Sequence, residues 1–476
     1  MSFIVYDLIF LVLFFLIVGM FLYKHRNQGK REGIMFIFRT QFGVKAINWI
    51  SGRYANVLHK IKYLVVGVGY LLMAAILYVL GLSLYRYISI PEITAVIKAP
   101  PIAPVIPYFP KLFGMESFFP PFYFTYFLVA LAIVAICHEF SHGIFMRLFK
   151  MKIKSTGIVL LGPILGAFVE QDEKDFKKKK NFEQRVVLAA GTFTNLLLAL
   201  IFFGLLVGFF FLTFQAGGYA YNTYSFIRVP INQIDEFGEQ IGEKQIVMGN
   251  QIISLNLSEA IINNKTYFIP DNLKKQIIGE DLVESDLSVL LYQDSPALRK
   301  EIKGVLKEID NKEITNEEDL RAFLMKSEPG EKIEIMTTYN EEKFSYELIL
   351  DEHPSNKSKG FIGIGYLETG NEDLTSRFIR FFTSFKDSST YYEPVWDGNF
   401  VIFIYNLIWW IMLINLLVAL FNMLPLGILD GGRFFYLTIL SLTKSKKLAR
   451  YSFKFMTYLL LLVFILFMVF WFIRVF

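Results

Sequence analysis

The sequence predicts a polytopic α-helical membrane protein with about six transmembrane helices, a short re-entrant β-like segment and a soluble α+β domain. Three observations predict this class. Apolar residues make up 54% of the 476 residues and charged residues only 19%, a more apolar balance than that of soluble globular proteins. Several apolar runs reach the roughly 20 residues that a helix needs to cross about 30 Å of hydrocarbon. The composition turns polar between 216 and 398, which indicates a domain outside the membrane.

Six segments are expected to span the membrane, and each is a nearly uninterrupted apolar run. The first run leads directly into Lys24, His25 and Arg26, and neither a basic region before it nor a small-residue cleavage site after it is present. We therefore expect a retained span and not a removed signal peptide. The expected spans are 3–22, 63–87, 122–149, 186–214, 399–424 and 453–475.

Two connecting segments differ from ordinary loops. The segment 88–120 is rich in proline, which forbids a continuous helix there. The segment 155–170 (STGIVLLGPILGAFVE) is apolar and rich in glycine, but it is too short to span a bilayer. Because open backbone groups cannot face hydrocarbon, we expect it to be a re-entrant strand or loop that is buried in protein. A short helix is expected at 433–442.

The positive charges predict the orientation of the chain. Lysine and arginine concentrate in the connections 23–62, 149–185 and 443–452, and the first of these holds nine basic residues against one acidic residue. With six spans all three connections lie on one side, which the positive-inside rule assigns to the cytosol. Both termini and the 216–398 domain then lie outside. We expect a multi-pass protein of the cell membrane, in contact with the lipid bilayer and without a nucleic-acid partner.

The chain is expected to divide into five parts. Residues 1–119 hold two spans and a basic cytosolic loop. Residues 120–215 hold the third span, the re-entrant segment and the fourth span, and residues 399–442 hold the fifth span with the polar motif that follows it. The extracytosolic domain, 216–398, separates these two parts. The last span lies in 443–476.

The third span contains the motif HEFSH at 138–142. Residues four apart lie on one face of a helix, so both imidazoles can hold one metal ion. Glu139 lies beside them, where its carboxylate can take a proton from water. Ionisable residues inside an apolar span are costly and mark functional sites. Cys137, the single cysteine, excludes a disulfide within the chain and a cysteine-based zinc site.

A catalytic zinc usually has three protein ligands and an open position, so His138 and His142 need a third partner. The other three histidines lie in the first basic connection and in the outer domain. A carboxylate must therefore complete the site. The candidate is Asp430 in NMLPLGILDGG (422–432), near the cytosolic end of the fifth span, as HEFSH is near the cytosolic end of the third. The alternative role of Asp430 is the N-cap of the following helix.

The second half of the outer domain has a readable order of strands and short helices. Ser295 and Asn316 are expected to cap two of these helices. The order of elements, with DSPA at 294–297 and EDL at 318–320, resembles a PDZ domain over about 285–352. The resemblance implies that the domain binds peptide as an added strand, whereas the alternative is an α+β domain that only fills space. The segment 219–284 has no signature. The expected strands are 289–292, 304–310, 332–336 and 344–350.

Three motifs together resemble the site-2 protease family of intramembrane metalloproteases: HEFSH, NMLPLGILDGG, and GTFTN at 191–195 in the fourth span. With the re-entrant segment and the PDZ-like insert, the resemblance covers most of 120–440. It implies one Zn²⁺ per chain, and it assigns roles to individual residues. Asn195 is expected either to hold the substrate strand or an oxyanion, or simply to bond another helix. The implied ligands are His138, His142 and Asp430, the implied catalytic acid/base is Glu139, and Asn422 is expected to support the Asp430 loop.

The resemblance further implies regulated intramembrane proteolysis by a zinc metalloendopeptidase. Its substrates would be single-span membrane proteins that another protease has already shortened, and the outer domain would screen their size or bind them. An alternative enzyme is a prenyl-type membrane metalloprotease, for which a glutamate is the expected third ligand. An alternative of another class is a non-catalytic membrane binding protein or metal carrier, which the presence of Glu139 disfavours.

Overall fold

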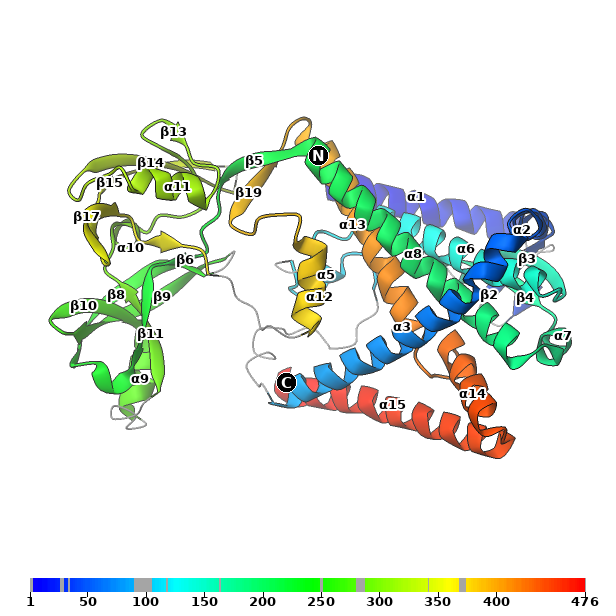
Figure 1. The fold of residues 1–476 in the computed structure, drawn as a ribbon. Coiled ribbons are helices and arrows are strands. Elements are labelled where there is room, and N and C mark those ends of the chain that lie inside the picture. The colour runs from blue at the N-terminus through cyan, green and yellow to red at the C-terminus, as the bar shows by residue number, and fades with distance from the viewer. Residues whose placement is uncertain are drawn as a thin grey trace. The chain divides into compact units, whose positions relative to one another are not determined.

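The computed structural model describes the ten ranges 3–25, 30–32, 35–89, 105–116, 119–161, 164–248, 251–279, 287–340, 342–367 and 374–475. The chain forms two compact units. One unit consists of Met1–Phe210 together with Asn399–Phe476, and the other of Phe211–Gly398. Figure 1 shows that the first unit is mainly helical and that the second is built mainly from strands.

In the described part of the chain, six helices are long and apolar enough to cross a membrane, as the sequence predicted. Several begin earlier than their apolar runs, because a helix continues through polar residues into water while hydropathy marks only its lipid-compatible part. The last helix, for example, begins at Lys446 and not at 453. The six are α1 (Phe3–Lys24), α3 (Ala55–Ser89), α6 (Phe124–Leu148), α8 (Asn181–Thr213), α13 (Gly398–Phe421) and α15 (Lys446–Val475).

The segment expected to be a re-entrant strand or loop is a β-hairpin in a four-stranded antiparallel sheet. The sheet order is β1-β2-β3-β4, with β1 (Lys30–Glu32), β2 (Met35–Thr40), β3 (Ile153–Leu161) and β4 (Ile164–Gln171). The two strands from the first basic connection were not anticipated. A Cβ at Gly157 would lie 2.1 Å from the carbonyl oxygen of Phe38, so only glycine allows β2 and β3 to pair there. The re-entry of the hairpin into the membrane stays a prediction.

Helix α6, which carries HEFSH, begins at a cap that another helix supplies. Its own N-cap residue, Tyr123, makes no side-chain cap bond. Asp7 of α1 is 1% exposed, and its carboxylate accepts hydrogen bonds from Phe124 N (2.7 Å), Thr125 N (3.0 Å) and the hydroxyl groups of Thr125 and Tyr108 (both 2.6 Å). The first N–H groups of a helix have no partner within it, and negative charge is favourable there. Asp7 therefore fixes the start of α6.

One apolar cluster joins the elements that surround HEFSH. It contains buried side chains from α3, α6, β4, α8, the end of α13 and the segment that follows α13. These elements therefore pack as one body. A second cluster surrounds Trp410 of α13, which is fully buried and donates its indole N–H to the carbonyl oxygen of Pro121 (3.1 Å). This packing holds α13 beside the first turns of α6.

Four shorter helices complete the described part of this unit. Helix α7 begins after Asp172, whose carboxylate accepts the backbone N–H groups of Lys174 and Asp175. Arg433 donates two hydrogen bonds to Glu173 (3.1 and 3.0 Å) and thereby holds the pKa of that carboxyl group below its usual value. This pair links α7 to α14, the helix that was expected at 433–442. The four are α2 (Phe42–Arg53), α5 (Phe109–Leu112), α7 (Glu173–Lys178) and α14 (Asp430–Thr443).

The second unit contains two larger sheets and a two-stranded one. The seven-stranded sheet has the order β18-β6-β8-β9-β10-β11-β7, and the six-stranded sheet has the order β15-β14-β12-β5-β19 with β13 beside β12. The segment without a sequence signature, 219–284, supplies most of the first sheet. The bounds are β5 (Phe214–Tyr219), β6 (Thr223–Tyr224), β7 (Phe226–Pro230), β8 (Glu236–Met248), β9 (Gln251–Ile262), β10 (Lys265–Pro270), α9 (Asp271–Gly279), β11 (Ser288–Gln293), α10 (Pro296–Lys300), β12 (Val305–Ile309), β13 (Lys312–Glu313), α11 (Glu317–Leu324), β14 (Lys332–Tyr339), β15 (Glu342–Ile349), β16 (Asp351–His353), β17 (Asn356–Phe361), β18 (Ile364–Gly365), α12 (Leu374–Thr383) and β19 (Thr390–Pro394).

The local elements of the PDZ-like segment are present, but one strand pairs elsewhere. Ser295 caps α10 by accepting the N–H of Leu298, and Asn316 caps α11 by accepting the N–H of Asp319. The strand expected at 289–292 is β11, and it pairs with β10 and β7 and not with β12, β14 or β15. An apolar run identifies a strand but not its neighbour, because pairing depends on distant residues. The strands of the segment 285–352 are therefore divided between sheets: β11 belongs to the seven-stranded sheet, β12 to β15 to the six-stranded sheet, and β16 to the two-stranded one.

Candidate active site

The second half of α6 brings the two histidines of HEFSH together. Because they are four residues apart, their side chains lie on one helix face. His138 and His142 are 7% and 6% exposed, and their Nε2 atoms are 3.0 Å apart. The half-buried Glu139 offers a carboxylate oxygen, and one ligand atom from each of these three residues lies within 4.8 Å of the other two. The motif thus forms one cluster.

Asp430 reaches this cluster from the C-terminal part of the chain. Its Oδ2 lies 3.2 Å from Nε2 of His138 and 3.2 Å from Nε2 of His142. The N-cap of α14 is Leu429, and Asp430 is the first residue inside the helix, so the alternative of Asp430 as an N-cap is wrong. Three donor atoms from two distant motifs therefore converge at one point.

The glycines after Asp430 explain how the loop turns so tightly. A Cβ at Gly431 would lie 2.3 Å from the carbonyl carbon of Met423, and one at Gly432 would lie 2.0 Å from the carbonyl oxygen of Leu426. Only glycine allows such close backbone approach. The carbonyl oxygen of Asn422 accepts the N–H of Gly431 (2.8 Å), so this residue supports the loop through its backbone.

Helix α8 packs against both imidazoles. Nδ1 of His142 is 2.7 Å from the carbonyl oxygen of Val187, and Nδ1 of His138 is 3.0 Å from the side-chain amide of Asn195. Between them, a Cβ at Gly191 would lie 2.6 Å from ring atoms of both histidines. Asn195 is fully buried. Its contact with His138 joins two helices, which is one of the two roles that the sequence left open.

The carboxylate of Glu139 lies against the edge of the β-sheet. Its Oε2 accepts the N–H of Val169 in β4 at 3.1 Å. Among the described strands, β4 pairs only with β3 and forms an edge of the sheet. The free edge of a strand is therefore adjacent to the cluster of donor atoms.

Some of these contacts have no signal in the sequence. The carbonyl oxygen of Val187 and the N–H of Val169 are backbone groups, which every residue carries. The four-residue spacing of Val187, Gly191 and Asn195 is a usable signal, because it puts all three on one stripe of α8. Asp7 carries the signal of an acidic residue inside an apolar span, which sequence analysis left without a role.

The motifs have counterparts among known proteins. A sequence model of peptidase family M50 matches residues 126–467, a range that contains HEFSH and the Asp430 motif. The chain belongs to peptidase family M50. It is therefore a membrane metalloprotease of the site-2 protease type, and zinc is the metal of this family. An uncharacterized protein of Methanocaldococcus jannaschii is 25% identical to this M50 peptidase over 424 residues, which cover 87% of this chain and 81% of the relative.

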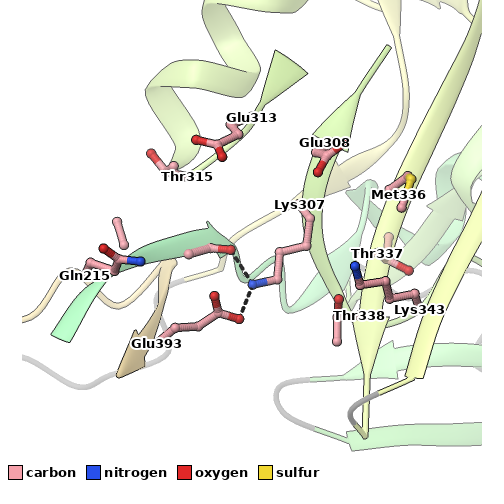
Figure 2. Close-up of a pocket in the computed structure, with 12 residues that line it drawn as sticks. Gln215, Lys307, Glu308, Glu313, Thr315, Met336, Thr337, Thr338, Lys343 and Glu393 are labelled. Carbon is pink, nitrogen blue, oxygen red and sulfur yellow. Dashed lines mark hydrogen bonds and ion pairs between the residues drawn. The ribbon is translucent and has the colours of Figure 1, made fainter. Parts of the chain in front are cut away.

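A separate cavity of about 580 Å³ lies in the 211–398 unit of this M50 peptidase. Figure 2 shows Lys307 in this cavity, where its ammonium group donates to the carbonyl oxygen of Gly217 and to the carboxylate of Glu393. The lining comes mainly from β5, β12, β13, β14, β15 and β19 and carries charges of both signs. None of the residues that line it belongs to the HEFSH or Asp430 motifs, so the cavity is distinct from the candidate active site.

Proposed function

We propose that this chain is an intramembrane zinc metalloendopeptidase that hydrolyses peptide bonds within or near transmembrane helices of other membrane proteins. The observation that carries the proposal is the convergence of three donor atoms. The Nε2 atoms of His138 and His142 and Oδ2 of Asp430 are 3.0–3.2 Å from one another, although His138 and Asp430 are 292 positions apart along the chain.

The chemistry of these donors fits a metal ion. In the neutral imidazole of His142 the single proton lies on Nδ1, which donates to the carbonyl oxygen of Val187, and Nε2 then carries a lone pair. A carboxylate oxygen and an imidazole lone pair repel one another at this distance unless a cation lies between them. Two imidazoles and one carboxylate with an open fourth position are a usual ligand set of catalytic zinc, and we expect one zinc per chain.

Glu139 is the proposed acid/base. His138, His142 and Asp430 would hold the zinc, which when bound would supply a Lewis acid for the ionisation of water near neutral pH. The carboxylate of Glu139 takes the proton from the attacking water and later gives it to the leaving amine. Its hydrogen bond from Val169 N holds one oxygen and leaves the other available for the proton.

The free edge of β4 is the proposed place for substrate. Helical backbone groups are bonded to one another, so a transmembrane helix must unwind before its carbonyl groups can react. An unwound segment can add to a strand edge as a further strand. Since Val169 in this strand donates to Glu139, a segment added to β4 lies next to the acid/base.

We further propose that the substrates are single-span proteins already shortened by another protease, and that the 211–398 unit screens or contacts them in an extracytosolic position. The cavity at Lys307 is the candidate contact for peptide. Because Glu393 already pairs with Lys307, a peptide carboxylate would have to displace Glu393 there.

Two alternatives are disfavoured by specific side chains. A prenyl-type metalloprotease is expected to use a glutamate as third ligand, whereas the third donor here is Asp430. A non-catalytic binding protein or metal carrier has no need for Glu139, whose carboxylate is held within 4.8 Å of the histidine donors.

Replacement of Glu139 by glutamine tests the proposal. Glutamine is nearly isosteric but cannot accept the proton, so we expect zinc content to stay at wild-type level while cleavage of a tagged single-span reporter falls by about 10²–10⁴-fold. The measurement is the rate at which the reporter fragment appears in cells that express either form.

The matched control is Glu116→Gln, which makes the same change at an exposed glutamate outside the donor cluster and should cleave at close to the wild-type rate. Fragment production by Glu139→Gln at the wild-type rate would show that Glu139 is not the acid/base. Wild-type protein without bound zinc would refute the metal site itself.

A further inference from the structure

The side-chain amide of Asn195 contacts a proposed zinc ligand, His138, at Nδ1, whereas Nε2 of His138 faces His142 and Asp430. Asn195 lies on α8, is fully buried, and approaches Nδ1 of His138 to 3.0 Å. This contact deepens the proposed function and rests on it, because it concerns how His138 is prepared for zinc.

The partner histidine shows what such a contact does. Nδ1 of His142 faces the carbonyl oxygen of Val187, which can only accept a hydrogen bond. The single proton of a neutral imidazole is therefore on Nδ1, and Nε2 is left with a lone pair that points at Asp430. A second partner of this kind commonly fixes the orientation and tautomer of a metal-bound histidine.

His138 needs the same tautomer, because its Nε2 faces the same donors. The Nδ2 amide group of Asn195 faces Nδ1, which would put the imidazole proton on Nε2, where a metal ion has to bind. In that orientation Oδ1 of Asn195 is buried, and no hydrogen-bond donor in the described part of the chain reaches it. The two ends of an amide have almost the same shape, so their assignment follows from the hydrogen bonds that each can make.

We infer that Asn195 is a positioning residue whose Oδ1 accepts the Nδ1–H of His138 and so keeps Nε2 of His138 free to bind zinc. Exchanging the positions of Oδ1 and Nδ2 of Asn195 places Oδ1 beside Nδ1 of His138, whose N–H can then donate to it. It also makes the two histidines equivalent, since each then donates its Nδ1–H to an oxygen of α8.

The position of Asn195 on α8 supports this role. Val187, Gly191 and Asn195 are spaced by four residues and lie on one stripe of the helix. The outer two supply an acceptor to one imidazole each, and Gly191 between them has no side chain that would collide with the rings. One helix face thus orients both ligands.

Zinc affinity of the purified full-length protein in detergent tests the inference without recourse to proteolysis. The probe is Zn²⁺ alone, competed against a chelator of known affinity. We expect the dissociation constant of Asn195→Ala to rise by about 10–100-fold, the usual effect of removing such a partner. Asn195→Asp keeps an acceptor oxygen in the same place, so it should bind zinc at least as tightly as the wild type.

Thr194→Val is the matched control. Thr194 is the preceding residue, and its hydroxyl oxygen lies 2.6 Å from that of Ser141. Because this contact does not involve an imidazole, zinc affinity should stay unchanged. Wild-type affinity in Asn195→Ala, or an equal loss in Asn195→Asp and Asn195→Ala, would overturn the inference. Absence of zinc from the wild type would instead overturn the proposed function, so the two failures are distinguishable.

Discussion

At the scale of single residues, the site depends on a glycine without a side chain, Gly191, as much as on the proposed ligands. Gly191 faces both imidazoles, and any side chain there would occupy the space that their rings fill. The GTFTN motif was marked in the sequence by its resemblance to the site-2 protease family. The sequence could not show which of its residues contacts which imidazole ring. The glycine allows α8 to approach α6 so closely that the carbonyl oxygen of Val187 and the side chain of Asn195 reach the histidine rings.

We expect Gly191→Ala to abolish high-affinity zinc binding. The added methyl carbon would lie 2.6 Å from Cε1 of His138 and 2.6 Å from Nε2 of His142, and backbone on both helices limits how far the rings can retreat. Zinc content per purified chain, measured by elemental analysis, gives the result.

The same substitution at Gly204, on the same helix, provides the comparison, because a Cβ there would meet no neighbouring side chain or other element within 4 Å. Gly204→Ala should retain the wild-type zinc content. Equal zinc content in both variants would contradict the close approach of α8 to the imidazoles.

At the scale of elements, α6, the helix that carries HEFSH, is positioned from both ends. Asp7 of α1 caps its first turn, and the sheet edge and α8 hold its last turns. A carboxylate that accepts four hydrogen bonds inside an apolar span is costly to leave unpaired, and its donors are equally costly to expose. The first helix is therefore a structural part of the protease unit as well as a membrane anchor.

We predict that Asp7→Ala lowers the free energy of unfolding by about 2 kcal/mol or more, since it leaves buried backbone and hydroxyl donors without an acceptor. Asp7→Asn keeps one acceptor oxygen and should lose less. Thermal unfolding of the purified protein in detergent gives the order wild type, Asp7→Asn, Asp7→Ala.

Leu13→Ala on the same helix is the reference, because Leu13 is 50% exposed and has little packing to lose. If Asp7→Ala unfolds at the same temperature as Leu13→Ala, Asp7 does not stabilise the start of α6.

At the scale of the whole molecule, the features that local pattern determines were predicted well from the sequence. Apolar runs indicated the six long helices, and the spacing within HEFSH indicated the clustered histidines. Ser295 and Asn316 were expected as helix caps and are found as such, because a cap depends on residues a few positions away.

Pairings between distant strands could not be predicted in this way. The strand at 289–292 joins a different sheet from its predicted partners, and β2, from the first basic connection, pairs with β3. Such pairings depend on the packing of side chains on both strands, which neighbours in sequence do not determine. The contact between Asn195 and His138 is of the same kind: a residue was marked as important, but its partner lay 57 positions away.

The orientation in the membrane gives the last prediction. Strand β2 precedes the α3 span, and β3 follows the α6 span, so two crossings separate them, yet they pair in one sheet. Paired strands lie on the same side of a membrane, as the basic connections also predict. The ion pair between Glu173 and Arg433 likewise joins the second basic connection to α14, the helix that leads into the third. We therefore expect cysteines at Lys178 and Lys446 to react with a membrane-impermeant reagent from the cytosolic side only, and a cysteine at Ser358 from the outer side only. The wild-type chain, whose one cysteine is the half-buried Cys137, gives the background. Labelling of Lys178→Cys and Ser358→Cys from the same side would refute the six-span orientation.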